Sequence, residues 1–290
     1  MTTTATAVFP IERRAATGAV ALDDHLAVEE PLEIRVAHAR GRTSGATGAG
    51  SAGGVPGLAG VTVAITMRTP GRDPELALGF LHGEGLLHAR DEVLDAANCA
   101  GAPNVVRVTL APDVPLERFG AGRRFHATSS CGLCGKDSLA AVLENLRGRR
   151  VEGRTPVPAA TLRALPERIR ARQAAFQRTG GLHAAALVTV DGQCLDLAED
   201  VGRHNAVDKL VGRAWSSGAL PGVDRVLFLS GRAGFELVQK AVMAGITTVA
   251  AVGAPSSLAV ELARTAGVTL VGFLGPERFN VYAGTERIDG

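Results

Sequence analysis

RVLFLSGRAGFELVQKAVMAGITTVAAVGAPSSLAVELARTAGVTLVGF, residues 225–273, alternates short apolar runs with longer segments of helical periodicity. Nearly continuous apolar strands joined by helices of this length are typical of parallel strands that are buried on both faces of a sheet. The sequence therefore predicts an α/β domain in this half of the chain. The predicted elements are strands at 225–229, 247–252 and 268–273 and helices at 235–244 and 256–266.

The residues before this stretch add antiparallel strands to the predicted sheet. An apolar strand at 184–190 is followed by Asp191-Gly192, a dipeptide typical of a tight hairpin turn, and by a short strand at 194–197. A helix is predicted across 205–211, and another at 162–176 with a break near Pro166. The half is therefore expected to be a three-layer α/β domain with a mixed sheet.

The N-terminal half predicts a smaller α+β part. Residues 32–36 and 61–67 alternate apolar and polar side chains as half-buried strands do, and 105–110 is a third strand. A helix is expected from Asp73-Pro74-Glu75, because proline and acidic residues suit a first helical turn. The predicted divisions are a disordered tail at 1–20, an α+β part at 21–125 with a flexible Gly/Ala loop at 41–60, a loop and helix at 126–155, and the α/β domain at 156–290.

Composition and charge narrow the class of protein. The 290 residues include 46% hydrophobic and 21% charged side chains, which is ordinary for a globular protein, and the formal net charge is +2. A charge this small gives no bulk attraction to nucleic acid or to an anionic membrane. With only four cysteines, no signal-peptide pattern and no membrane-spanning apolar run, we expect a cytoplasmic protein without nucleic-acid or membrane partners.

Two of the cysteines form a Cys-Gly-Leu-Cys pair, Cys131 and Cys134, ahead of a predicted amphipathic helix. Backbone N–H groups and the positive end of such a helix favour thiolate over thiol, and the thiolate attacks sulfur or binds metal. The chemistry of the chain is therefore predicted to lie at this pair. Apolar residues follow at the spacing of one helix face: Leu139, Val142, Leu143 and Leu146.

Three kinds of chemistry suit the cysteine pair. A structural zinc site needs four ligands, but Cys99 and Cys194 are single and distant in sequence. A thioredoxin-like redox pair has the same spacing but follows the first strand of a βαβ unit. A sulfur-relay cysteine would carry a persulfide, and the glycines of the motif would let its loop move between a donor and an acceptor. The residues alone leave all three open.

A second cluster, EDVGRHNAVDK at 199–209, gathers acidic, basic, imidazole and amide side chains on a turn that leads into a helix. His204 and Asp208 are four residues apart and are expected on one side of that helix, as are Asn205 and Lys209. A capped helix with such pairs would explain the cluster without any ligand. A strand-to-helix turn of an α/β sheet is, however, where a ligand usually binds.

A third segment, SGRAGFE at 230–236, also joins a buried strand to a helix. Its small residues would let backbone N–H groups approach a phosphate at the helix N-terminus, and Arg232 could pair with that phosphate. The segment GAPSS at 253–257 repeats the arrangement one strand later. Turns of this kind are weak indications when taken singly.

Taken together, the motifs resemble the formate dehydrogenase accessory sulfurtransferases, the FdhD family. The resemblance spans about Leu22 to Ile288, and the matching segments follow the order of the family. They are EEPLEI (29–34), MRTPG (67–71), SSCGLCGK (129–136), TGGLH (179–183), EDVGRHNAVDK (199–209), SGR (230–232) and RFNVY (278–282).

The resemblance implies a cytoplasmic sulfur carrier that accepts persulfide sulfur from a cysteine desulfurase. It would pass this sulfur to Mo-bis(molybdopterin guanine dinucleotide), bound as a substrate, for use by formate dehydrogenase. The persulfide would form on Cys131, with Cys134 assisting, and no resident metal is expected. The implied fold is cytidine-deaminase-like, and because the family is often dimeric, a homodimer is expected.

The resemblance also implies where the cofactor binds. The segment before Arg-Phe-Asn contacts the cofactor in the family, and this chain has Gly275-Pro276 where members commonly carry an arginine. The alternatives are a cofactor chaperone without sulfur chemistry and a zinc or redox protein. The predicted cofactor-binding residues of the 156–290 domain are Phe273, Leu274, Gly275, Pro276, Glu277, Arg278, Arg203, His204, Ser230 and Arg232.

Overall fold

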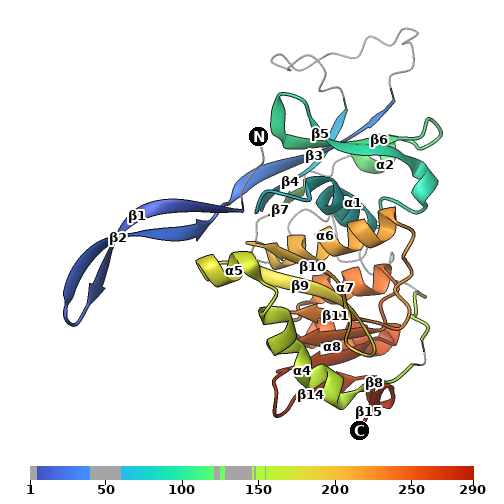
Figure 1. Cartoon of the computed structure of the whole chain (residues 1–290). Helices are drawn as coiled ribbons and strands as arrows, with labels where there is room; N and C mark the ends of the chain where they lie inside the picture. Colours follow the sequence, from blue (N-terminus) through green and yellow to red (C-terminus); the bar gives the residue numbers. More distant parts are fainter. Residues whose placement is uncertain (1–4, 40–59, 121–124, 128–145, 147, 154) are drawn as a thin grey trace.

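The structure, a computed structural model, describes residues 5–39, 60–120, 125–127, 146, 148–153 and 155–290. These residues form two packed halves and a hairpin that projects from them (Figure 1). The predicted Gly/Ala loop, apart from Gly60, and the cysteine pair with its helix, apart from Leu146, lie outside the described residues.

The N-terminal half is a five-stranded mixed sheet covered by one long helix. Strands β3 and β4 are antiparallel, as expected for 32–36 and 61–67, and β6 confirms the strand at 105–110. The helix α1 begins at Asp73, as predicted. The elements are β3 Glu30–His38, β4 Val61–Arg68, α1 Asp73–Gly83, β5 Val93–Cys99, β6 Ala102–Leu110, α2 Glu117–Gly120 and β7 Phe125–Ala127, with the sheet order β5-β6-β3-β4-β7.

The C-terminal half contains a six-stranded mixed sheet in the order β10-β9-β11-β12-β13-β14. The three central neighbours β11, β12 and β13 are parallel, and the flanking strands are antiparallel, which confirms the predicted mixed sheet. The strands are β9 His183–Thr189, β10 Cys194–Asp200, β11 Arg225–Leu229, β12 Thr248–Ala251, β13 Thr269–Gly272 and β14 Asn280–Ala283, and β8 Val157–Pro158 pairs with β15 Ile288–Asp289.

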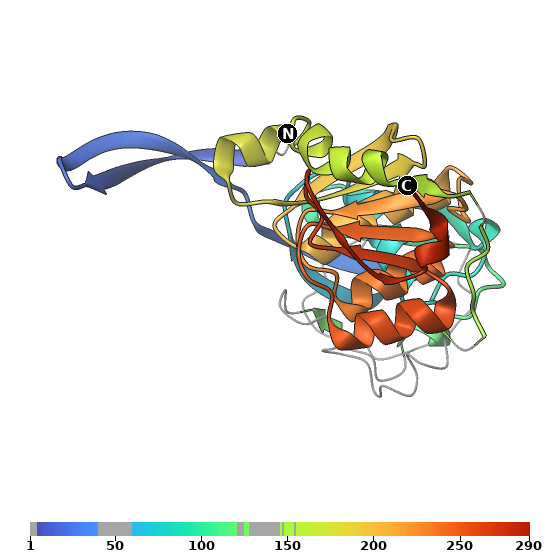
Figure 2. The ribbon, with the colours of Figure 1, turned by 90° about the horizontal axis from the view of Figure 1, so that it is seen from below.

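Helices cover both faces of this sheet, so that it forms the middle of three layers (Figure 2). Leu227 and Leu229 of β11 pack into the cluster formed with α6, α7 and α8, whereas Val226 and Phe228 pack into the cluster on the α4 side. Such burial on both faces explains the uninterrupted apolar run of this strand. The helices are α4 Ala159–Arg170, α5 Ala174–Thr179, α6 Arg203–Ser216, α7 Phe235–Met243 and α8 Ser257–Ala266.

The predicted break near Pro166 is wrong. Helix α4 passes through Pro166, and the interruption lies at 171–173, before α5. Proline removes one backbone hydrogen bond from a helix. The buried residues Leu162, Leu165 and Ile169 hold both sides of the proline against the sheet, and this packing outweighs the lost bond.

The two halves meet where α1 crosses α6. A methyl group added at Gly79 would overlap the carbonyl of Asp208, and one added at Gly212 would overlap the carbonyl of Glu75. Only glycine allows the two helix backbones to approach this closely. This crossing brings the N-terminal sheet against the C-terminal half.

The N-terminal residues differ from the disordered tail predicted for 1–20. They form the antiparallel hairpin β1 Thr6–Ala15 and β2 Gly18–Ala27, in register from Thr6–Ala27 to Ala15–Gly18. The start of the chain is rich in threonine and alanine, so the alternation of larger residues at Phe9 and Ile11 is a weak strand signal in the sequence. The strand forms because these residues pair with β2.

Candidate functional site

The candidate site lies at one edge of the six-stranded sheet. Strands β11, β12 and β13 all end at this edge, and α7 and α8 begin there, after the turns predicted at 230–236 and 253–257. Strand β10 also ends there and leads into α6. Three helix N-termini, each with unpaired N–H groups and a positive dipole end, therefore point to one edge.

The turns after these strands are hydrogen-bonded to one another. The Gly253 N–H donates to the Gly231 carbonyl at 2.9 Å, and the Phe273 N–H donates to the Gly253 carbonyl at 3.2 Å. A Cβ at Gly253 would lie 3.0 Å from the Arg232 backbone, so a small residue is needed between the turns. The structure thus brings together the segments around Arg232 and Phe273.

The segment 273–278 forms a turn directly after β13. The Gly275 N–H donates to the Arg278 carbonyl at 3.1 Å, and Pro276, Glu277 and Arg278 are exposed. Phe273 has a φ of 51° and is 51% exposed, whereas Leu274 is buried in the core. Leu274 therefore anchors the turn, and its neighbours remain accessible to a ligand.

The 199–209 cluster divides into structural residues and residues that stay at the edge. Asp200 is fully buried and pairs with Lys209 at 2.7 Å, and it accepts hydrogen bonds from Asn205 and from the Thr69 N–H. The expected alignment of Asn205 with Lys209 is confirmed, because both contact Asp200. These residues tie α6 to the end of β4 and are not free to bind a ligand.

Glu199 also has a structural role, because its carboxylate accepts hydrogen bonds from the N–H groups of Ala175 and Phe176 at the start of α5. Arg203 and His204, the first residues of α6, are the members of the cluster that remain at the sheet edge. The Nε atom of Arg203 is buried and has no hydrogen-bond partner within the described part of the chain. Such a donor suits an anionic ligand.

His204 is the first of a series of buried ionisable groups between α6 and α7. Its Nε2 lies 3.6 Å from Oε2 of Glu236, and Oε1 of Glu236 lies 3.5 Å from Nζ of Lys240. Lys240 in turn pairs with Asp208 at 2.7 Å, which confirms that His204 and Asp208 share one side of the helix. All four side chains are largely or completely buried.

Burial and neighbouring charges determine the protonation states of His204 and Lys240. Desolvation, with the charges of Lys240 and Arg203, lowers the pKa of His204 to about 3, so its imidazole is neutral near pH 7. Burial alone would lower the pKa of Lys240, but the carboxylates of Asp208, Glu236 and Glu84 outweigh that effect and raise it. The chain therefore holds a fixed cation behind a neutral histidine.

The depressed pKa of His204 predicts that this group makes the folded state less stable in acid. The unfolded chain binds a proton at the ordinary histidine pKa of 6.5, while the folded chain resists protonation until about pH 3. Between these values stability falls as the pH falls, by up to about 1.4 kcal/mol per pH unit from this group. We expect His204→Gln to reduce the slope of unfolding free energy against pH in urea titrations.

The matched control for this titration is His25→Gln, because His25 is exposed on β2. An unaltered slope in His204→Gln would contradict the assignment of acid sensitivity to His204.

A pocket of about 360 Å³ opens beside these residues, and it contains a site residue that the sequence reasoning missed. His183, Ser230, Gly181, Arg170 and Phe176 are among its lining residues. His183 is the first residue of β9 and lies opposite Asp200, the last residue of β10. Since β9 runs antiparallel to both β10 and β11, it begins at the edge where those two strands end. The motif TGGLH ends at this histidine, which was the available signal.

The environment of the pocket suits a polar, anionic ligand with planar groups. Burial and the charge of Arg203 lower the pKa of His183, so this histidine is also neutral near pH 7. The Arg170 guanidinium lies 4.7 Å from the centre of the Phe176 ring. Ser230 accepts a hydrogen bond from the Ala184 N–H at 2.8 Å, which fixes its hydroxyl at the rim.

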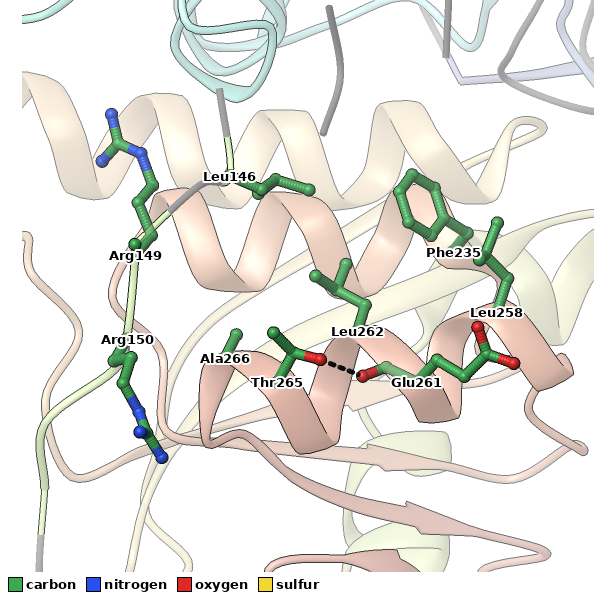
Figure 3. A pocket seen from close by; sticks show the side chains of 10 residues that line it. Leu146, Arg149, Arg150, Phe235, Leu258, Glu261, Leu262, Thr265 and Ala266 are labelled. Carbon is green, nitrogen blue, oxygen red and sulfur yellow. Dashed lines mark hydrogen bonds between the residues drawn. The ribbon is translucent and has the colours of Figure 1, made fainter. Parts of the chain in front are cut away.

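A second, apolar pocket of about 440 Å³ lies outside the helical layer. Figure 3 shows Phe235, Leu258 and Leu262 of α7 and α8 with Leu146 at its border. Leu146 is the last residue of the apolar face predicted after the cysteine pair, and it is buried. Cys131 and Cys134 themselves lie outside the described residues.

The part of the chain that the structure describes contains no group of three or more His, Cys, Asp or Glu side chains that could hold a metal ion. Cys99 and Cys194 are free cysteines within it. No helix among the described residues is both long enough and apolar enough to cross a membrane.

Comparison with known proteins shows the family. The model of the FdhD/NarQ family matches residues 57–289. The chain belongs to this family. It is 52% identical over 274 residues to the sulfur carrier protein FdhD of Streptomyces avermitilis, a match that covers 91% of this chain and 89% of the relative. It is 45% identical to the sulfur carrier protein FdhD of Mycobacterium tuberculosis, with 98% of this chain and 99% of the relative covered.

A solved structure shares the fold of this FdhD/NarQ family member. It is the crystal structure of a protein described as a formate dehydrogenase accessory protein from Desulfotalea psychrophila, with a TM-score of 0.71 and 23% sequence identity. The match covers 99% of this chain and all of that chain. The mixed α/β architecture is thus shared, while the more specific cytidine-deaminase-like description stays a prediction.

Proposed function

We propose that this sulfur carrier family member is a sulfurtransferase that supplies sulfur to the molybdenum cofactor of formate dehydrogenase. Its substrate would be Mo-bis(molybdopterin guanine dinucleotide), a polyanionic molecule with two guanine rings. The observation that carries the proposal is Arg203, whose buried Nε lacks a partner among the described residues and which begins one of the three helices that start at this sheet edge. Helix N-termini and arginine are the groups that bind phosphates.

In the proposed reaction the Cys131 thiolate attacks the outer sulfur of a persulfide on a cysteine desulfurase. The bond between that sulfur and the desulfurase cysteine breaks, the desulfurase cysteine leaves as a thiolate, and a persulfide remains on Cys131. In the second step the S–S bond of that persulfide would break, Cys131 would leave as a thiolate, and the outer sulfur would pass to the molybdenum of the substrate, which in its reduced state would supply the two electrons that convert this sulfur to sulfide. Cys134 would assist as the second thiol of the pair.

The residues at the sheet edge would hold the cofactor during the second step. Arg203 and Arg232 would pair with phosphates, and the neutral His204 and the Ser230 hydroxyl would form hydrogen bonds without adding charge. The exposed turn at 273–278 would cover the cofactor from the side of β13. The chain has Gly275-Pro276 where family members commonly carry an arginine. We therefore assign the phosphate contacts that such an arginine would make to Arg203 and Arg232.

The setting of the reaction belongs to the same proposal. We expect a cytoplasmic protein that meets a cysteine desulfurase and formate dehydrogenase in turn, and that acts as a homodimer. The competing functions are a chaperone that binds the cofactor without carrying sulfur, and a zinc or redox protein at the Cys131–Cys134 pair.

Intact-mass measurement tests the sulfur-carrying step. After incubation with a cysteine desulfurase and free cysteine, we expect the protein to gain sulfur that dithiothreitol removes, and peptide mapping to place it on Cys131. A cofactor chaperone would gain no sulfur while still binding the cofactor. A zinc protein would carry bound metal when purified, which elemental analysis detects. Either of these outcomes would contradict the proposal.

A further inference from the structure

The β1–β2 hairpin is a two-stranded ribbon that extends away from the rest of the molecule (Figures 1 and 2). Its base packs against α5, and its tip, at Ala15 and Gly18, lies far from both sheets in the two views. The ribbon pairs with no third strand among the described residues. Isolated two-stranded ribbons are at best marginally stable in water, so a ribbon of this length needs further packing.

The register of the ribbon gives it one apolar face. Residues directly opposite in an antiparallel pair point to the same side, and successive residues alternate sides. The apolar face, as named here, therefore carries the pairs Ala7–Leu26, Phe9–Asp24, Ile11–Leu22, Arg13–Val20 and Ala15–Gly18. The other face carries Thr6–Ala27, Val8–His25, Pro10–Asp23, Glu12–Ala21 and Arg14–Ala19.

Much of the apolar face is uncovered. Phe9 is 50% exposed, Leu26 is 42% exposed and Val20 is 64% exposed. Apolar residues grouped on one side of a projecting element mark an interaction surface, because they would otherwise remain in contact with water. On the opposite face half of the residues are polar, and there the Arg14 guanidinium pairs with Glu12 at 2.6 Å.

We propose that the apolar face packs against the same face of a second copy of this chain. The face is self-complementary in charge, because Arg13 and Asp24 flank the central Ile11–Leu22 pair on opposite sides. Consider a two-fold axis that lies between the two ribbons at the level of this central pair. The second ribbon would then run in the reverse direction, and Arg13 of one copy would lie beside the partner's Asp24. Apolar residues would meet at the centre, as an isologous interface requires.

This charge pattern favours a second copy over an unrelated partner. A partner whose surface is uniformly positive would be repelled by Arg13, and one whose surface is uniformly negative would be repelled by Asp24. The reversed copy places opposite charges at both positions. The proposal rests on the homodimer expected above and names its surface, and it does not depend on sulfur transfer.

The test compares two valines on the two faces of the same ribbon. Val20 is 64% exposed on the apolar face, and Val8 is 55% exposed on the other face. We expect Val20→Asp and Phe9→Asp to raise the dimer dissociation constant by about 10-fold or more, measured by sedimentation over a range of concentrations. Val8→Asp is the matched control and should dimerise like the unchanged protein.

A charge exchange tests the reversed arrangement itself. Arg13→Asp and Asp24→Arg should each weaken dimerisation, because each sets like charges side by side, and the double variant should restore it. Circular dichroism would verify that every variant remains folded.

The outcomes distinguish a wrong interface from a wrong oligomeric state. If the unchanged protein and all variants dimerise equally, the homodimer stands but the ribbon is not its interface, and the inference fails. If the unchanged protein is a monomer at all concentrations, both the homodimer and the inference fail. If the charge exchange gives no rescue, the reversed pairing of ribbons is wrong.

Discussion

Cys131→Ala is expected to abolish the activation of formate dehydrogenase in a strain that lacks its own FdhD protein. The alanine variant has no thiolate to accept sulfur, so the activity should fall to the level of the strain without the protein. Loss of Cys134 should leave a measurable part of the activity if that residue only assists. The measurement is formate oxidation in cell extracts, with the amount of the variant protein determined by immunoblot.

The chain offers matched controls for this prediction. Cys99 and Cys194 are free thiols that lie away from the sheet edge, at the end of β5 and the start of β10. Burial raises the pKa of Cys194, which makes it a poor nucleophile. Alanine at either position should leave activation unchanged. Full activation by Cys131→Ala would overturn the persulfide assignment while leaving cofactor binding at the sheet edge possible to test separately.

Lys240→Met is expected to destabilise the fold strongly. Lys240 is the cation that faces Asp208 and Glu236, and both it and Asp208 are almost fully buried. Removing one partner leaves carboxylates in the interior without a counter-charge, which costs about 3–5 kcal/mol. A loss of that size should lower the melting temperature by roughly 6–15 °C in calorimetry.

A double variant distinguishes the loss of the pair from the loss of packing. Asp208→Leu combined with Lys240→Met replaces the pair with apolar side chains, and buried pairs replaced in this way often retain stability. The double variant should therefore be more stable than Lys240→Met alone. If the single variant melts at the temperature of the unchanged protein, removing Lys240 leaves no costly unpaired charge in the interior. This account of the α6–α7 contact would then be wrong.

The strands and helices at 225–273 could be predicted because their periodicity reflects burial within one sheet. The hairpin at Asp191-Gly192 was likewise confirmed, since the short connection between β9 and β10 is encoded by residues close together in sequence. The β1–β2 ribbon was not predicted, because its stability comes from pairing and packing rather than from a strong local preference. The continuous passage of α4 through Pro166 also depends on contacts with the sheet.

The site was predictable in its location more than in the roles of its residues. The motifs identified Arg203 and His204, but they could not separate them from Asp200 and Lys209, whose partner Thr69 lies on a distant segment. His183 was missed as a site residue because its place at the edge follows from strand direction and register. Such pairings between separate segments are invisible in a single sequence.

The carboxylate of Asp200 has a consequence for how such proteins can change. One oxygen accepts from the Thr69 N–H, and the same carboxylate pairs with Lys209. At the helix crossing, Gly79 fits against the backbone of Asp208 and Gly212 against that of Glu75. The Thr69 contact and the two glycine contacts each join a residue of one half to a residue of the other. Neither half can therefore change at this boundary without a compensating change in its counterpart.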